Sequence, residues 1–333
     1  MEKKQFGNFS KSIYTDLALE VKEAVSEEKG EELDGVEMEV NEDSGVKVTW
    51  VKITNENGEK LMGRPIGNYI TIESEALRTN DVDAHEEIIK IMVDNFSQII
   101  NLNQNETVLI IGLGNWNVTP DALGPRVISK TLITRHIKEH LPDSIDSRVR
   151  PVAALSPGVM GITGIETYET VKGLVERLRP SLIIAIDALA SRSVNRINST
   201  IQISDTGVAP GAGMGNKRQA LNEESLGVPV IAIGVPTVVD AATLVNDTMD
   251  LLLSQMIKET GSGHEFYDAL IGLESQEKYQ LILQLLTPYS GNMFVTPKEV
   301  DAVIDRLSNI IANALNISLH KGVTKEDINR FMY

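Results

Sequence analysis

Two aspartates stand where apolar runs of the sequence lead into unusual loops, and carboxylates in such places can carry acid–base chemistry. Asp187 closes the apolar run SLIIAID, and Asp121 follows Pro120 in the stretch LIIGLGNWNVTPDALGP. A carboxylate directly after a buried strand is costly to desolvate unless it is paired, hydrogen-bonded or functional. Two carboxylates held close together resist ionising at the same time, so one keeps a proton while the other is a base. Such a pair suits peptide cleavage, in which the base activates water and the acid polarises the carbonyl.

Each aspartate also has a plainer interpretation. Asp121 begins a predicted helix after a proline, where an aspartate commonly caps the helix or complements its dipole. Asp205, which follows the run TIQIS, is the alternative partner for Asp187. The residues alone therefore leave the pairing and the choice of partner open.

Other catalytic chemistries find less support in the sequence. The turn before Asp121 starts like a dinucleotide-binding loop, but Asn117 stands where the third glycine of that fingerprint belongs, and GAGMGNKR lacks the order of a phosphate-binding P-loop. The chain has no cysteine, which excludes disulfides, thiolate metal sites and a cysteine nucleophile. His85 and His264 each start an H-E pair, but neither completes the H-E-x-x-H zinc motif. We therefore expect a carboxylate site without a bound cofactor.

Four unusual loops, three of them rich in glycine, must hold the site together. They are GLGNWNVTPDALGP, SPGVMGITGIET, DALASRSVNR and DTGVAPGAGMGNKR, and each follows a predicted strand. Ligands and catalytic groups of open α/β sheets gather beyond the carboxyl ends of the strands, and glycine lets backbones approach closely there. The loops therefore predict one shared edge that carries the chemistry.

The elements behind these loops predict an α/β fold in a single domain. Apolar spacing predicts a helix from residue 17, alternation over 35–74 predicts an antiparallel β-meander with a turn at Asn57-Gly58, and a helix is expected over 83–100. Strands and helices then alternate, with one helix expected over 122–141, and the last 55 residues look helical. Near-continuous apolar strands favour a mostly parallel sheet flanked by helices.

Composition narrows the class of partner and the compartment. The 333 residues carry a formal charge of −16, which argues against binding nucleic acid or anionic lipid, since both need basic patches. The start of the chain has no apolar signal region, and no stretch reaches the roughly 18 apolar residues that span a bilayer. We expect a cytoplasmic protein without a membrane or nucleic-acid partner.

At its loops the chain resembles the germination proteases, spore endopeptidases that degrade small acid-soluble spore proteins. The matching stretches are YTDLALE, GLGNWNVTPDALGP, SPGVMGITGIET, IIAIDALASRSVNRINSTIQISDTGVAPGAGMGNKR and IGVPTVVDAATL. The resemblance implies a fold like that of the hydrogenase maturation proteases, a homotetramer in the forespore or spore core, and an atypical aspartic-type endopeptidase. Its two essential aspartates fall on Asp121 and Asp187. The hydrogenase maturation relatives bind metal with a histidine for which we find no match, so a metal-free mechanism is expected.

The resemblance also implies self-processing. Family substrates are cut after an acidic residue in sequences of the type Thr-Glu-Ile/Phe-Ala-Ser-Glu, and YTDLALE is similar. The family is made as a zymogen, so we expect a pro-segment of residues 1–16, cleavage between Asp16 and Leu17, and a peptidase domain over 17–333. The plainer interpretation is that Thr15 or Asp16 caps the following helix.

An acidic residue before the cut needs a cationic or amide-rich pocket, because an unpaired buried carboxylate is costly. The loops DALASRSVNR and DTGVAPGAGMGNKR carry four basic residues that could form it: Arg192, Arg196, Lys217 and Arg218. Three rival functions remain: a metallopeptidase that uses Asp121 and Asp187 as ligands, a module that binds spore proteins without cutting them, and a nucleotide-binding protein.

Overall fold

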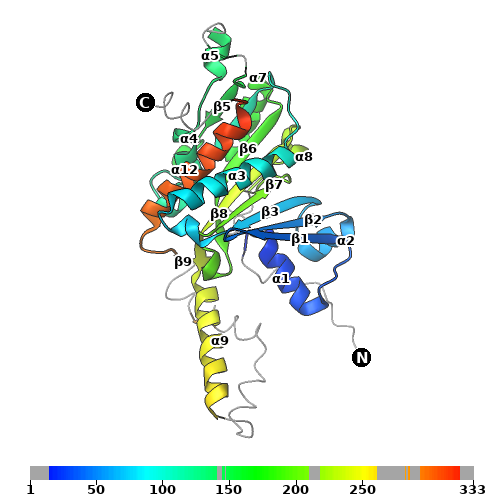
Figure 1. Ribbon diagram of the computed structural model, residues 1–333, viewed down its shortest axis with the longest axis vertical. Coiled ribbons are helices and arrows are strands. Elements are labelled where there is room, and N and C mark those ends of the chain that lie inside the picture. Colours follow the sequence, from blue (N-terminus) through cyan, green and yellow to red (C-terminus); the bar gives the residue numbers. More distant parts are fainter. Residues whose placement is uncertain are drawn as a thin grey trace.

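The computed structural model describes residues 15–140, 145–146, 148–209, 218–260, 282, 284–285 and 293–322. It is an α/β fold built on one mixed nine-stranded sheet (Figure 1). The strands are β1 (Val36–Asp43), β2 (Val46–Ile53), β3 (Gly67–Glu73), β4 (Val108–Gly112), β5 (Val152–Leu155), β6 (Leu182–Ser191), β7 (Thr200–Ser204), β8 (Val230–Asp240) and β9 (Phe294–Val295). Their order is β1-β2-β3-β7-β8-β6-β4-β5, and β9 pairs with β8.

The sheet is less parallel than the apolar runs predicted. Strands β5, β4, β6 and β8 are parallel neighbours, whereas β7 is antiparallel to both β8 and β3. Only residues 192–199 separate β6 from β7, and so short a connection cannot make the crossover that a parallel strand needs. The predicted meander is present as β1–β3, but its last strand pairs with β7 and extends the main sheet.

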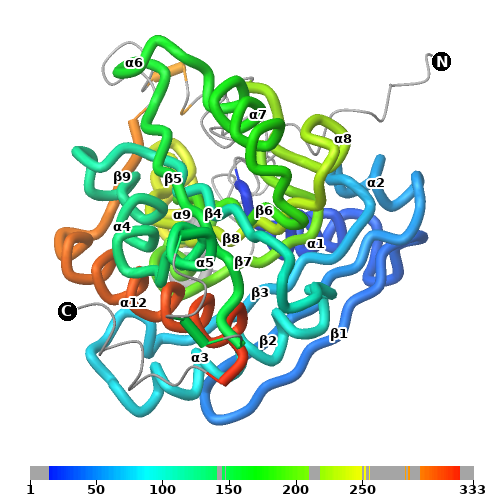
Figure 2. Tube along the Cα trace, turned by 90° about the horizontal axis from the view of Figure 1, so that it is seen from above, coloured from blue at the N-terminus to red at the C-terminus, as the bar shows by residue number. Residues whose placement is uncertain are grey.

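Helices cover both faces of the sheet (Figure 2). One face packs against α3 (Val82–Ile99), α4 (Leu123–Ser129) and α12 (Val300–Leu319), and the other against α7 (Thr167–Leu178) and α8 (Glu223–Leu226). A third apolar cluster joins α1 (Ala18–Lys29) and α2 (Glu56–Met62) to β2 and β3. Further helices of the described residues are α5 (Arg135–His140), α6 (Met160–Thr163), α9 (Ala241–Thr260), η2 (Glu75–Arg78), η3 (Thr119–Asp121) and η5 (Val194–Arg196).

Two local predictions are wrong. Asn57-Gly58 lies inside α2 and not in a turn, because Asn55 caps that helix by accepting the N–H groups of both residues, each at 2.9 Å. The single helix expected over 122–141 is broken into α4 and α5. At the break, the backbone N–H of Leu132 donates to the side chain of Asn316 on α12 at 2.8 Å, so a tertiary contact replaces the helical hydrogen bond.

Two further predictions concern the C-terminal helix and membrane-spanning segments. The helix start VTKEDINRFM lies outside the described residues. Among the helices that the structure describes, none combines the length and apolar character needed to cross a membrane. Helix α9 extends away from the rest of the molecule (Figure 1). The likeness to hydrogenase maturation proteases stays a prediction.

Candidate active site

The glycine turn after β4 serves close packing around Asp121. Gly114 has φ +104°, and a Cβ there would lie 2.0 Å from the carbonyl oxygen of Asp121. The backbone N–H of Asn115 donates to that carbonyl oxygen at 3.0 Å, while Leu113 N–H donates to Ile186 of β6 at 2.8 Å. The turn therefore folds the Asp121 segment back over the end of β4, beside β6, which explains its glycines without a bound phosphate.

Asp187 lies within β6 and not at its end, which corrects the prediction from sequence. Strand β4 stops at Gly112, which pairs with Ile186, so Asp187 is the first residue of β6 beyond its shorter neighbour. The residue is only 8% exposed. A carboxyl group in this position can face the turn that carries Asp121.

The two aspartates lie close enough that the charge of Asp121 acts on Asp187. Burial raises the pKa of Asp187 well above its usual value, and the charges of Asp121 and Asp16 raise it further. Burial also raises the pKa of Asp121, to about 6, although the Asn115 N–H and the Arg218 charge oppose that rise. Near neutral pH, Asp121 is therefore mostly ionised, whereas burial and the neighbouring charges favour the protonated form of Asp187.

The predicted processing site lies against β6 close to Asp187. The backbone N–H of Asp16 donates to the Ala190 carbonyl at 2.9 Å, and the Ala190 N–H donates to the Asp16 carboxylate at 2.8 Å. Leu17, the next residue, is fully buried. The Asp16–Leu17 peptide bond is thus held on β6, close enough to Asp187 for the charge of Asp16 to act on it.

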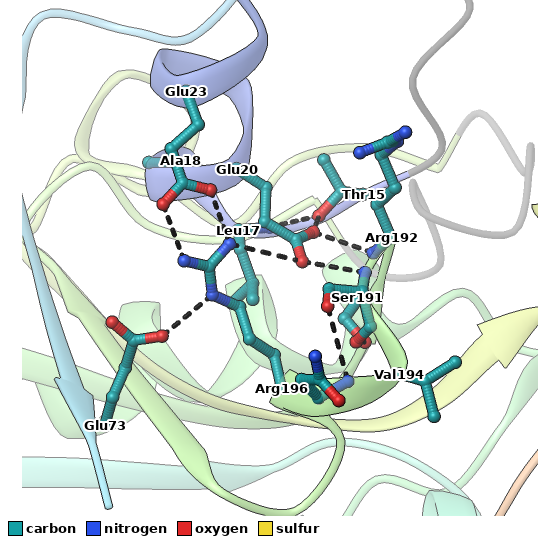
Figure 3. A network of polar contacts seen from close by, with 12 residues as sticks. Thr15, Leu17, Ala18, Glu20, Glu23, Glu73, Ser191, Arg192, Val194 and Arg196 are labelled. Atoms are coloured by element: carbon teal, nitrogen blue, oxygen red, sulfur yellow. Dashed lines mark hydrogen bonds and ion pairs between the residues drawn. The ribbon is translucent and has the colours of Figure 1, made fainter. Parts of the chain in front are cut away.

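A network of hydrogen bonds fixes the chain on both sides of this bond (Figure 3). The carboxylate of Glu20, which is 4% exposed, accepts the backbone N–H groups of Arg192 at 2.7 Å and Ser193 at 2.9 Å. The Thr15 hydroxyl donates to Glu20 and accepts from the Leu17 N–H at 3.0 Å. Helix α1 begins only at Ala18, and neither Thr15 nor Asp16 is its N-cap residue.

Arg196 joins this network to the sheet. Its guanidinium lies 3.6 Å from Glu20, 2.6 Å from Glu23 and 2.8 Å from Glu73 of β3, and the side chain is 15% exposed (Figure 3). A hollow of about 550 Å³ opens beside these four side chains and not over the two aspartates. Arg196 therefore anchors α1 on the sheet.

The four predicted acid-binding residues have different surroundings. Arg196 binds the glutamates just described, and Arg192 forms an exposed ion pair with Asp247 at 3.7 Å. Arg218 is near enough to lower the pKa of both Asp121 and Asp187. Lys217 lies outside the described residues. The Asp16 carboxylate instead meets a backbone donor, the N–H of Ala190.

The remaining candidates of the sequence lie elsewhere. Asp205, the alternative partner, accepts the backbone N–H of Asn68 at 2.8 Å and its side-chain amide at 2.6 Å. His320 is the buried C-cap residue of α12, and its Nδ1 also accepts the Arg150 N–H at 3.1 Å. Within the described part of the chain, no three His, Asp or Glu side chains gather as a metal site would require.

Sequence reasoning missed Gln202. This residue of β7 is 8% exposed, and its side chain hydrogen-bonds to the backbone on both sides of Leu17. The sequence did contain a signal for this residue, because the predicted strand TIQIS carries a side-chain amide between two isoleucines. Its partners, 184 and 186 residues away in the chain, could not be read from the sequence.

Comparison with known proteins finds relatives along nearly the whole chain. A family model described as germination protease matches residues 14–272 and 262–332. Over 324 residues the chain is 51% identical to a germination protease of Clostridium perfringens, which covers 96% of this chain and 99% of the relative. Identity is 50% to that of Clostridium tetani, with the same coverage, and 42% to that of Bacillus subtilis, over 95% of both chains. The resemblance drawn from the loops is confirmed, and the matched stretch includes Asp121, Asp187 and the Thr15–Glu20 segment.

Proposed function

The chain belongs to the germination protease family, and from that membership we propose that Asp121 and Asp187 are the catalytic pair of an endopeptidase. The family is one of peptidases, so the substrates are proteins. The observation that carries the proposal is that buried Asp187 and half-buried Asp121, from different elements, lie close enough for the charge of Asp121 to raise the pKa of Asp187.

The proposed chemistry divides between the two carboxyl groups. Asp121, ionised near neutral pH, takes a proton from a water molecule as the water oxygen attacks the peptide carbonyl carbon. Asp187, protonated, donates a hydrogen bond to the carbonyl oxygen. Its proton passes to the leaving nitrogen when the carbon–nitrogen bond breaks. The products are a new carboxyl terminus and a new amino terminus, so atoms and charge balance.

Replacing each aspartate by asparagine tests this pair. Asp121→Asn and Asp187→Asn should each reduce peptide cleavage by about 10³-fold or more while leaving the circular dichroism spectrum and assembly unchanged. Asp205→Asn is the matched control, because that strand-end aspartate binds Asn68 and should keep wild-type activity. Full activity in either pair variant would refute the assignment.

We further propose that the protein is a zymogen that cleaves itself between Asp16 and Leu17 and releases residues 1–16. The support is the contact of Asp16 with β6 beside Asp187, and the extended backbone of Leu17, with φ −85° and ψ 122°. N-terminal sequencing after mild acidification should find a new terminus at Leu17. An intact Met1 after prolonged incubation would count against self-processing.

The biological role that fits this activity is the first step in degrading small acid-soluble spore proteins during germination, in the spore core, by cleavage after acidic residues. The relatives named above carry the name germination protease. Incubating the processed protein with purified small acid-soluble spore proteins and mapping the cuts by mass spectrometry tests the substrate. Cuts after neutral residues would refute the proposed specificity.

Two alternatives are separated by simple measurements. A metallopeptidase that uses the same aspartates as ligands would lose activity on exhaustive chelation, and the aspartate mechanism would not. A module that binds spore proteins without cutting them would leave its partners intact overnight. We also propose a homotetramer, which sedimentation velocity would detect.

A further inference from the structure

We propose that Gln202 is a catalytic residue for self-cleavage, one that holds the Asp16–Leu17 peptide bond in place and polarises its carbonyl group. The Nε2 of Gln202 donates to the carbonyl oxygen of Asp16 at 3.1 Å, and its Oε1 accepts the backbone N–H of Ala18 at 2.6 Å. One buried side chain thus binds the chain on both sides of Leu17. The inference rests on the proposed self-processing and names a residue that acts in it.

The sheet places Gln202 on the same face as Asp187, two strands away. Asp187 of β6 pairs with Gly234 of β8, and Gly234 pairs with Gln202 of β7. Side chains that pair across neighbouring strands lie on the same face, so Asp187 and Gln202 share a face, two strand spacings or roughly 10 Å apart. Gly234 between them has no side chain. Asp16 interacts with both neighbours, since its charge acts on Asp187 and its carbonyl accepts from Gln202.

The carbonyl oxygen is the atom whose charge changes most during hydrolysis. As water adds to the carbonyl carbon of Asp16, this oxygen becomes an oxyanion, and a donor already aimed at it stabilises that state more than the starting amide. Gln202 gives up no proton. The proton that reaches the Leu17 nitrogen comes through the carboxyl pair, so the amide adds positioning and electrostatic stabilisation to the proposed chemistry.

Gln202 also caps helix α1, and the experiment must separate this structural role from catalysis. Leu17, the N-cap residue of α1, offers no side-chain acceptor, and the Gln202 Oε1 takes the N–H of the first helical residue, Ala18. Capping needs an acceptor, whereas polarising the Asp16 carbonyl needs a donor. Substitutions that keep one function and remove the other therefore distinguish the two roles.

The experiment follows self-cleavage of the full chain at a series of pH values. Gln202→Met, which lacks both groups, should slow cleavage about 10²-fold at every pH, as the loss of one oxyanion donor does. Gln202→Glu keeps the acceptor for Ala18 but can donate only when protonated. Relative to the wild type at each pH, it should therefore be slow at neutral pH and recover in acid. A purely structural role would leave Gln202→Glu at the wild-type rate throughout.

Thr71→Val is the matched control. Thr71 pairs with Gln202 on the neighbouring strand, is fully buried, and its hydroxyl has no hydrogen-bond partner among the described residues, so this variant should cleave normally. A Gln202→Met rate within threefold of the wild type, or a Gln202→Glu rate equal to it at neutral pH, would overturn the inference. If the wild type does not cleave itself, or if the Asp121→Asn variant cleaves itself as fast as the wild type, the proposed function itself fails.

Discussion

At the scale of the residue, the two aspartates of the site differ because their surroundings differ. Asp187 lies within a strand, 8% exposed, and receives the charges of Asp121 and Asp16, whereas Asp121 lies in a turn with a backbone donor nearby. Desolvation penalises the charged form of both groups, but more strongly for the one in the sheet. The same chemical group can therefore serve as acid at one position and as base at the other.

The pH dependence of peptide cleavage should report this difference. The proposed mechanism requires ionised Asp121, whose pKa is about 6, so the rate should fall as the pH drops below about 6. Arg218 lowers the pKa of both carboxyl groups, so Arg218→Gln should move the acid limb to higher pH by roughly half a unit. Arg192→Gln, which changes only an exposed ion pair with Asp247, is the control. An acid limb that stays in place or moves to lower pH would contradict the assignment.

At the scale of the element, helix α1 depends on one buried cation. Arg196 binds Glu20 and Glu23 of α1 and Glu73 of β3. Arg196→Met should lower the free energy of unfolding by about 1.5–3 kcal/mol, because Glu23 and Glu73 lose charged hydrogen bonds while Glu20 keeps its backbone donors. Urea denaturation measures the change.

Arg192→Met provides the comparison for that experiment. Its ion pair with Asp247 spans 3.7 Å between side chains that are 47% and 36% exposed, so the loss should stay below about 1 kcal/mol. Equal effects of the two variants would show that α1 does not depend on the Arg196 network.

The junction of α12 and β5 should make stability depend on pH. Burial, with the Arg150 and Lys138 charges, lowers the pKa of His320 to about 4. Between pH 4 and 6.5 the unfolded chain therefore binds more protons than the native one, so this contribution is present above pH 6.5 and is lost as the pH falls toward 4. The loss amounts to at most about 3 kcal/mol.

Comparison with His320→Asn isolates that contribution. Asparagine can still accept the Arg150 N–H but does not titrate, so the variant should lack the loss between pH 6.5 and 4. The raised pKa values of Asp121 and Asp187 act in the opposite direction in both proteins and cancel in the difference. An identical pH profile for the two proteins would contradict the prediction.

At the scale of the whole molecule, helix α9 extends away from the body (Figure 1). Apolar side chains on it are exposed. Val245, Met249 and Leu252 are 36%, 38% and 59% exposed, and their spacing of four and three residues puts them on one face of the helix. A projecting helix with such a face is a suitable contact between subunits of the proposed tetramer.

Charge on that face should weaken the assembly. Met249→Glu with Leu252→Glu should shift sedimentation velocity from the tetramer to smaller species, because burying two carboxylates in an apolar contact is costly. Asp247→Ala, on the other side of α9, is the control and should leave the assembly intact. A tetramer that persists in the double variant would show that α9 does not hold it together.

The sequence by itself determined what depends on local pattern. Apolar periodicity located α1, α3 and the buried strands, since it reflects which side of each element is covered. The loop motifs identified Asp121, Asp187 and the Thr15–Glu20 segment as the residues to examine. Chemical type and neighbouring residues were enough for that step.

Only the tertiary structure decided how these parts meet. It made β7 antiparallel, extended β6 beyond Asp187, and brought Gln202 to a backbone segment 186 residues away. It also set the different pKa values of Asp121 and Asp187, because desolvation and charge act through space. Hydrophobic periodicity indicates whether a residue is buried, but not which other segment buries it. The pKa of a carboxyl group depends on the charges and donors of that segment.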